Sequence, residues 1–328
     1  MREAFVRTLT SLAEEDARVV LVTGDVGFGV LADYARRFPR QFLNAGISEQ
    51  NMTGVATGLA LTGRVVYTYS IGNFPTLRCL EQIRNDACYH RANVKVVAVG
   101  GGFSYGALGI SHHATEDLAI MRSLPDITVV APGDCWEAEH ATRAIHAHSG
   151  ACYLRLDRAS IYDAQPDDGE FRIGRARIVR EGRDITLICA GGILDEARIA
   201  ADALAVEGIQ CRVVSMHTLK PLDSAAIFAA CAETGGIVTV EEHTVVGGLG
   251  SAVAEVCLES GLLPRCFKRV GLRAGFSSIV GDQSYLRHCY GMDADAIATT
   301  VRALIYGAAD GALGVAAAVR EPQAQRTR

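Results

Sequence analysis

The chain has 328 residues, of which 49% are apolar and 21% charged, and its formal net charge is −5. This composition is typical of a compact globular protein and excludes disordered, collagen-like and coiled-coil classes. The charge balance provides no cationic surface of the kind that binds nucleic acid or an anionic membrane. The apolar runs are short and interrupted by glycine, so none predicts a membrane span. The length allows one large α/β domain or two ordinary ones.

The first residues and the cysteines indicate the cellular compartment of the protein. Residues 1–7 mix acidic and basic side chains and lack the apolar stretch of a secretory signal. The ten cysteines lie singly, without a C-x-x-C pair, and are interpreted as small buried hydrophobes in a reducing compartment. We therefore expect a cytoplasmic protein.

Short β-branched runs alternate with stretches of helical period through the first half of the chain. The expected strands are residues 18–23, 64–69, 94–99 and 128–131. The expected helices are residues 30–38, 48–62 and 75–90 and one that follows Asp134, and a glycine-rich loop spans 100–113. Ser48 and Asp134 are the expected helix caps. Apolar strands between helices predict a parallel sheet that is covered on both faces.

The stretch 157–174 contains five acidic residues and no apolar periodicity, so it predicts an interdomain linker. After it the alternation resumes, with strands at 185–190, 210–215 and 236–241 and helices at 194–207, 224–232 and 248–260. The fold class expected is α/β, with two doubly wound, mostly parallel sheet domains in series. We set the domains at 1–160 and 177–312, the linker at 161–176, and a flexible tail at 313–328.

Active sites of open α/β sheets lie beyond the carboxyl ends of strands, so the segments after each strand are the candidates. The glycine clusters at 24–29 and 247–250 lack the spacing of a dinucleotide-binding loop, and no phosphate-binding P-loop pattern occurs. Glu49 is more informative, since it falls in the first turn of an expected helix. Two interpretations remain open: an ordinary interaction with the helix dipole, or a half-buried carboxyl of raised pKa that exchanges a proton with a ligand nitrogen.

Several short motifs, in their order and spacing, resemble the thiamine-diphosphate-dependent transketolase family. The resemblance is closest to its split-transketolase and 1-deoxyxylulose-phosphate-synthase-like members and covers residues 2–308. The motifs are Arg37-Phe38-Pro39, Asn44-Ala45-Gly46-Ile47-Ser48-Glu49-Gln50-Asn51, Tyr69-Ser70, Glu81-Gln82, Ser111-His112-His113, Pro132-Gly133-Asp134, Leu219-Lys220-Pro221-Leu222-Asp223, Thr239-Val240-Glu241-Glu242-His243 and Gly247-Gly248-Leu249-Gly250. The resemblance implies a pyrimidine-binding domain followed by the family's C-terminal domain.

The resemblance also implies roles in binding the cofactor. Glu49 matches the glutamate that hydrogen-bonds the aminopyrimidine ring of thiamine diphosphate, a cofactor that acts as an electron sink. Phe74 matches the aromatic residue that stacks on that ring, with an ordinary core aromatic as the alternative. Asp25 matches an acid near the thiazolium side, with a turn-forming aspartate as the alternative.

Four further residues match substrate-binding positions. His112 matches a histidine that lines the substrate channel and moves protons, and His113 stands beside it where the family usually has glutamine. Arg158 and Arg78 match arginines that bind the anionic end of a phosphosugar, a task suited to the planar guanidinium. A solvated or structural histidine and surface ion pairs are the alternatives. Leu108 and Gly101 depart from the family's usual aspartate and arginine, which argues against a standard pentose-phosphate substrate and against the synthase assignment.

The motif that holds Mg²⁺ and the diphosphate in this family, G-D-G followed by an asparagine, does not occur in the chain. The resemblance therefore implies a partner, an N-terminal transketolase-like subunit that holds the metal and the diphosphate, in an α2β2 heterotetramer. Two domains of the family's three fit within 328 residues. The cluster at 241–243 is interpreted as an interdomain or subunit contact, with a solvated loop as the alternative.

The preferred hypothesis is a subunit that transfers a two-carbon ketol unit from a ketose, phosphorylated or not, to an aldose. A beta chain of a 2-oxo-acid dehydrogenase decarboxylase and a 1-deoxyxylulose-phosphate-synthase-like enzyme are the alternatives within the fold. A subunit that serves only as a scaffold is the alternative of another class.

Overall fold

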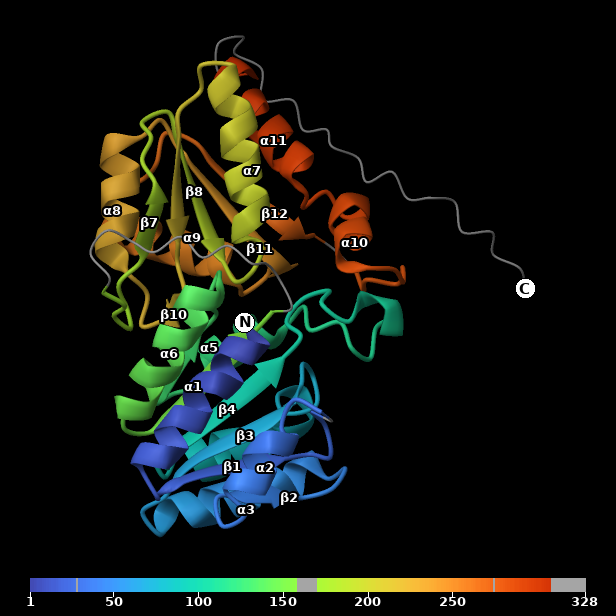
Figure 1. The fold of residues 1–328 in the computed structure, drawn as a ribbon. Coiled ribbons are helices and arrows are strands. Elements are labelled where there is room, and N and C mark those ends of the chain that lie inside the picture. The colour runs from blue at the N-terminus through green and yellow to red at the C-terminus, as the bar shows by residue number, and fades with distance from the viewer. Residues whose placement is uncertain (28, 158–169, 274, 308–328) are drawn as a thin grey trace.

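The computed structural model describes the chain except for residues 28, 158–169, 274 and 308–328. Two mostly parallel sheets, each flanked by helices, stand one above the other in Figure 1. The predicted fold class is thereby confirmed. None of the helices in the described part of the chain has the length and apolar character needed to cross a membrane.

The first half of the chain builds one sheet and its helices. Its elements are α1 (Arg2–Glu15), β1 (Val19–Thr23), α2 (Ala32–Arg37), β2 (Phe42–Asn44), α3 (Glu49–Leu61), β3 (Val65–Ile71), the 3₁₀ turn η1 (Leu77–Cys79), α4 (Leu80–Gln82), the π-helical η2 (Ile83–Cys88), β4 (Val94–Val99), the 3₁₀ turn η3 (Gly106–Leu108), α5 (Asp117–Ser123), β5 (Ile127–Val130), α6 (Cys135–Ala147) and β6 (Ala151–Leu156).

The first sheet has seven strands in the order β10-β5-β6-β4-β3-β1-β2. Six run parallel, and the seventh, β10 (Thr218–Lys220), comes from the second half of the chain and pairs antiparallel with β5. The second half therefore completes the sheet of the first. In Figure 1 β10 lies between the two halves of the molecule.

Alternate residues of the strands face opposite helical layers, as the pleat requires. Val20 and Val22 of β1 pack with Met52 and Ala56 of α3. On the other face, Val19 and Leu21 pack with residues of α1, α2 and α6. Both faces are thus covered, which accounts for the burial of every residue of β1 and β4 and of all but the last residue of β3.

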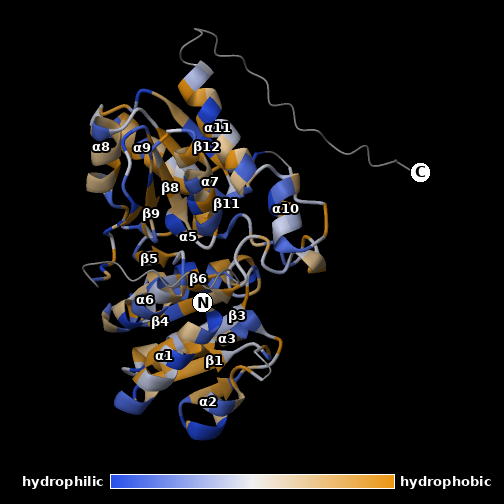
Figure 2. Cartoon of the chain, turned by 45° about the horizontal axis from the view of Figure 1, so that its top comes forward, coloured by the Kyte–Doolittle hydropathy of each residue, from blue (hydrophilic) through white to orange (hydrophobic). Residues whose placement is uncertain are grey.

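The second half builds a five-stranded sheet in the order β12-β11-β8-β9-β7, with only β7 antiparallel. Its elements are β7 (Arg177–Arg180), β8 (Ile185–Ala190), α7 (Leu194–Val206), β9 (Cys211–Ser215), α8 (Ser224–Glu233), β11 (Ile237–Thr244), α9 (Leu249–Ser260), β12 (Phe267–Leu272), α10 (Gln283–Cys289) and α11 (Ala294–Gly307). The side of this sheet that faces α8 and α9 shares one apolar cluster with the first sheet. Figure 2 shows hydrophobic colouring along the strands of both sheets.

Side-chain caps start several helices. Asp134 accepts a hydrogen bond from the backbone of Glu137 at 2.8 Å, as the sequence predicts. Ser48 does stand at the start of α3, but its hydroxyl donates to the carbonyl of Ala45 at 2.9 Å, so the predicted cap by Ser48 is wrong.

Other elements of the first half differ from the sequence-based expectation. The single helix expected over 75–90 is divided into the 3₁₀ turn, α4 and the π-helical turn. Helices α1 and α5 and strands β2 and β6 were not expected. Most of the expected linker, together with Arg158 and the tail, lies outside the described residues, so the domain limits stay a prediction.

The two halves are joined by a buried cluster of charged groups. The guanidinium of Arg155 on β6 donates to Asp117 Oδ2 at 3.0 Å and to the carbonyl of Glu242 on β11 at 2.9 Å. Asp157 Oδ1 lies 3.7 Å from the same guanidinium, and Tyr153 donates its hydroxyl to Asp117 at 2.5 Å. A cation with no exposed surface thus contacts two carboxylates of the first half and a backbone carbonyl of the second.

Replacing Arg155 with methionine should lower the free energy of unfolding by about 3–5 kcal/mol, because Asp117 and Asp157 lose their buried partner. Arg36→Met is the matched control, since Arg36 pairs with Asp33 at the exposed surface and should change stability by less than about 0.5 kcal/mol. Urea denaturation followed by circular dichroism measures both variants. Equal losses in the two variants would contradict the role assigned to the buried cluster.

Candidate functional site

The candidate residues gather at the carboxyl edge of the first sheet. Asp25 follows β1, Glu49 follows β2 at the first position of α3, Phe74 follows β3, and His112 lies in the loop after β4. The four strands are neighbours in the sheet order. The segments after them therefore meet at one edge, where ligands of open α/β sheets bind.

Glu49 is buried, with 3% of its side chain exposed, and its Oε2 accepts a hydrogen bond from Arg78 Nη1 at 2.7 Å. No hydrogen bond between the described residues engages Oε1. A side chain at Gly24 would begin 3.2 Å from Glu49 Cγ, so the glycine allows the carboxylate to lie against the end of β1. The Arg78 side chain is 47% exposed, so the pair joins a buried carboxylate to a partly solvated cation.

Phe74 connects Arg78 with His112. The Arg78 guanidinium lies 4.7 Å from the centroid of the Phe74 ring, within the range of a cation–π contact. The His112 ring meets the Phe74 ring edge-on, with centroids 5.2 Å apart and an interplanar angle of 71°. The structure thus brings Glu49, Arg78, Phe74 and His112 into one continuous row.

His112 is half-buried in the loop after β4. Burial lowers the pKa of its ring below the ordinary value, and the nearby His113 lowers it further. Its Nδ1 lies 3.0 Å from the hydroxyl of Ser111. A neutral imidazole at pH 7 can both donate and accept a proton, as proton transfer at a substrate oxygen requires.

Asp25 lies beside this row in a left-handed backbone conformation, with φ of 57°. Its backbone N–H donates to Asn44 Oδ1 at 3.1 Å, and Asn44 Nδ2 donates to Asp25 Oδ1 at 2.8 Å. The two residues join the ends of β1 and β2. A turn-forming role for Asp25 is therefore visible, and its second carboxylate oxygen has no partner in the described part of the chain.

His113 is placed differently from the expectation. Its ring is 1% exposed, with Nε2 3.0 Å from the carbonyl of Gly106 and Nδ1 2.7 Å from the hydroxyl of Ser277. Both nitrogens have protein partners, which argues against the predicted direct contact with substrate. Arg158, the other predicted anion ligand, falls outside the described residues.

Two residues at the carboxyl end of β3, Ser70 within the strand and Asn73 after it, lie at the site although the sequence motifs indicate no role for them. Ser70 Oγ is buried without a partner in the described chain, and a side chain at Gly24 would begin 3.6 Å from it. Asn73 Nδ2 donates to the carbonyl of His113 at 2.9 Å and so ties the turn that carries Phe74 to the loop that carries His112. Ser70 is a polar residue near the carboxyl end of the buried strand β3, and Asn73 follows that strand; these positions are the signal that could have identified them.

The cluster at 241–243 lies at the interdomain contact that the sequence predicts. Glu241 accepts hydrogen bonds from the backbone of Leu249 and Gly250 at the start of α9, at 2.7 and 2.9 Å. Burial raises the pKa of Glu241. Glu242 accepts a hydrogen bond from the backbone of Phe103, across the domain boundary, at 2.5 Å. These buried groups are structural, and they explain the glycine at 248, where a side chain would meet Glu241 and His243. At Gly250 a side chain would instead meet Arg269 and Thr239.

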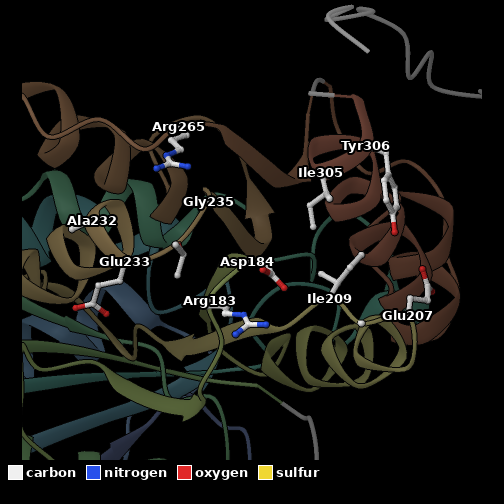
Figure 3. A pocket seen from close by; sticks show the side chains of 12 residues that line it. Arg183, Asp184, Glu207, Ile209, Ala232, Glu233, Gly235, Arg265, Ile305 and Tyr306 are labelled. Atoms are coloured by element: carbon white, nitrogen blue, oxygen red, sulfur yellow. The ribbon is translucent and has the colours of Figure 1, made fainter. Parts of the chain in front are cut away.

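Two cavities are lined by residues other than those of this row. One, of about 550 Å³ and drawn in Figure 3, opens at the amino ends of the second sheet's strands, opposite to the edge where ligands are expected. Its acids Asp184, Glu207 and Glu233 are engaged with a backbone N–H, Arg302 and Arg212. The other, of about 580 Å³, lies between residues 104–108 and helices α7 and α10. Over the described ranges, no group of three His, Cys, Asp or Glu side chains could hold a metal ion.

Comparison with known proteins identifies the family. The pyrimidine-binding domain of transketolases matches residues 1–162, and the transketolase C-terminal domain matches residues 174–297. The chain belongs to the transketolase family. It is 37% identical to one of the subunits of the apulose-4-phosphate transketolase of Phocaeicola vulgatus, over 91% of this chain and 95% of that protein.

A longer relative and a solved structure extend the comparison. The chain is 36% identical to 1-deoxy-D-xylulose-5-phosphate synthase of Heliobacterium modesticaldum, over 92% of this chain but only 46% of that protein. It superposes on a split gene transketolase, described as an inactive beta4 tetramer, with a TM-score of 0.83 and 36% identity, over 93% of this chain and 97% of that one. The Phocaeicola relative and the solved structure place the chain among split transketolase-family subunits.

The cofactor of the transketolase family, thiamine diphosphate, fits the polar groups found here at its pyrimidine end. The Oε1 atom of Glu49 and the buried hydroxyl of Ser70 lack partners within the described chain, and both lie close to Gly24. The Phe74 ring contacts the guanidinium of Arg78, which in turn binds Glu49. A buried carboxylate and an aromatic ring that share one arginine suit a heteroaromatic ring that carries hydrogen-bonding nitrogens.

The His112 ring should titrate below the ordinary histidine pKa of 6.5, because burial disfavours its charged form. NMR measures the titration midpoint of His112 from the histidine resonances between about pH 4 and about pH 9, a range that extends roughly two units either side of the ordinary pKa. A His112→Asn variant identifies the resonance by its loss. A midpoint at or above 6.5 would show that the ring is more hydrated than its position indicates.

Proposed function

We propose that this chain is one subunit of a thiamine-diphosphate-dependent transketolase. It transfers a two-carbon ketol unit from a ketose, as its phosphate, to an aldose acceptor. The observation that carries the proposal is the buried carboxylate of Glu49, which lies at the ligand edge of the sheet with one oxygen unpartnered. The name of the Phocaeicola relative, a transketolase for apulose 4-phosphate, supports a phosphorylated ketose.

Some residues of the row would bind the cofactor and others the substrate. Thiamine diphosphate, when bound, supplies the electron sink for cleavage of a carbon–carbon bond. Glu49 holds a proton at the pyrimidine nitrogen, Phe74 packs against the pyrimidine ring, and Asp25 lies toward the thiazolium side. Arg78 orients the Glu49 carboxylate by its 2.7 Å hydrogen bond, and the exposed part of its guanidinium remains available to substrate.

Substrate handling would fall to the loop and to the strand end beyond it. His112 accepts and returns the hydroxyl proton of the sugar, a task for which a neutral ring is ready at pH 7. Arg158 and Arg78 bind the phosphate, since a guanidinium presents two parallel donors to its oxygens. His113 would hold the loop that carries His112 in place through its own buried contacts.

A partner chain would complete the site. Apolar side chains are exposed in the same segments as the candidate residues: Ile47 before Glu49, Leu77 beside Arg78, and Leu108 and Ile110 before His112. Exposed apolar groups around a functional site are typical of an interface. We propose an N-terminal transketolase-like subunit that holds Mg²⁺ and the diphosphate, an α2β2 heterotetramer, and a cytoplasmic location, which ten free cysteines support.

The purified chain alone should therefore show no ketol transfer, and activity should appear when the partner subunit, thiamine diphosphate and Mg²⁺ are added. The reason is that the chain lacks the residues for the diphosphate end. A coupled assay of aldose-dependent ketol transfer measures both states. Full activity of the chain without a partner would refute the split-subunit proposal.

Glu49→Gln should lower the turnover rate of the assembled complex by roughly 100-fold or more, because the amide cannot exchange the proton. Glu259→Gln, at an exposed position on α9, is the control and should leave the rate unchanged. Cofactor titration of the same complexes distinguishes loss of proton transfer from loss of binding. A near-normal rate for Glu49→Gln would leave a scaffold role, with the partner holding the whole cofactor.

A synthase-like or 2-oxo-acid-decarboxylating reaction is the second candidate, favoured by the 36% identity to the 1-deoxyxylulose-phosphate synthase. Ketol transfer releases no CO₂, whereas decarboxylation of a 2-oxo acid does. The assembled complex should therefore form no CO₂ from pyruvate or other 2-oxo acids. Stoichiometric CO₂ release would favour the second candidate over ketol transfer.

A further inference from the structure

The loop that carries His112 is held by the second domain as well as by the first. It leaves the end of β4 and closes on itself where Gly102 and Ala114 exchange backbone hydrogen bonds of 2.8 and 3.0 Å. Between these residues the chain runs across the domain boundary, where the carbonyl of Gly106 accepts a 3.4 Å hydrogen bond from the backbone of Gly281. The loop therefore contacts the second domain beyond its own base.

His113 makes the central contact. Its Nε2 lies 3.0 Å from the carbonyl oxygen of Gly106. Its Nδ1 lies 2.7 Å from the hydroxyl of Ser277, which is itself buried, and 3.2 Å from the carbonyl oxygen of the same residue. Both ring nitrogens thus have hydrogen-bond partners, one within the loop and one in the second domain.

Aromatic packing fixes the same ring from the side. The His113 ring meets Phe103 edge-on, with centroids 5.3 Å apart. Phe103 in turn stacks on Tyr290, which follows α10, at 5.4 Å and 21°. The His113 ring therefore has neighbours on its edge and at both nitrogens, and these contacts restrict its orientation.

Glu242 holds the start of the loop from the second domain. Its Oε1 accepts from the backbone of Phe103 at 2.5 Å and from Gln283 Nε2 at 2.9 Å, and its Oε2 pairs with Arg287. Gly102 has φ of 59° and no room for a side chain beside that carboxylate. The base of the loop thus fits against the second domain closely.

We propose that His113 is a positioning residue that ties the loop to the second domain through Ser277, and that the second domain thereby sets the place of the His112 ring. The two rings face different neighbours: His112 meets Phe74 of the first domain, and His113 meets Phe103 and Ser277. The proposal rests on the proposed function in one respect, that His112 takes part in the reaction. Misplacement of a reacting group by about 1 Å can cost up to about 100-fold in rate.

The test compares His113→Ala, His113→Gln and Ser277→Ala in the assembled complex. His113→Ala should lower kcat by up to about 100-fold with little change in KM, because binding groups stay in place while the proton-transferring ring moves. His113→Gln should restore most of kcat, since an amide can donate to Gly106 and accept from Ser277. Ser277→Ala should also lower kcat. Its control is Ser123→Ala, because the exposed hydroxyl of Ser123 donates to the carbonyl of Ile120 within α5.

Hydrogen exchange measured by mass spectrometry on the full chain gives a readout that needs no activity. Peptides covering 102–114 should exchange faster in His113→Ala and Ser277→Ala, while β4 keeps its protection. The proposal would be overturned if hydrogen exchange of the loop stayed unchanged in the variants. It would also be overturned if kcat of His113→Gln were as low as kcat of His113→Ala. If His113→Ala does not fold, Ser277→Ala and His113→Gln decide the matter. An inactive wild-type complex would refute the proposed function and leave the exchange measurement to test the loop contact alone.

Discussion

The guanidinium of Arg155 is the contact on which both halves of the molecule depend. It lies at the end of β6 with no exposed surface, and it reaches Asp117 at the start of α5, the carbonyl of Ala114 at the base of the His112 loop, and β11 of the second sheet. A buried cation is tolerated only where acceptors surround it. The same five-donor group therefore specifies the distance between the two sheets and the place where the loop after β4 returns to the first domain.

The charged groups around Arg155 make the contact between the two halves sensitive to the loss of any one of them. Asp117, Asp157 and Glu242 face only two arginines, Arg155 and Arg287, in the described part of the buried interface. Burial raises the pKa of Asp157, and Arg155 opposes that effect. Because removal of either arginine would leave unpaired buried carboxylates, the domains cannot slide past one another without a large cost. This rigidity is what allows a residue of the second domain to position a loop of the first.

The local pattern of the sequence was sufficient to predict the alternation of strands and helices, the α/β class, the Asp134 cap, the place of Glu49 in the first turn of a helix, and the placement of Phe74 and His112 after strands. It was insufficient wherever the deciding contact is distant in sequence. Strand β10 joins the first sheet only because β5, almost ninety residues earlier, offers a free edge. Strand β6 was missed because Arg155 interrupts its apolar run, and the buried state of His113 depends on Ser277, 164 residues away.

The pairing of Glu49 with Arg78 is of the same long-range kind, and it bears on how the candidate site could exist before any ligand arrives. A carboxylate that is 3% exposed loses most of its hydration, and without a donor this loss would cost several kcal/mol. Arg78 supplies one donor from the surface side and keeps nearly half of its own side chain in solvent, so its own desolvation stays small. The second oxygen is left for a ligand. A preformed carboxylate of this kind need not reorganise on binding, which is the condition under which a fixed group contributes most to catalysis.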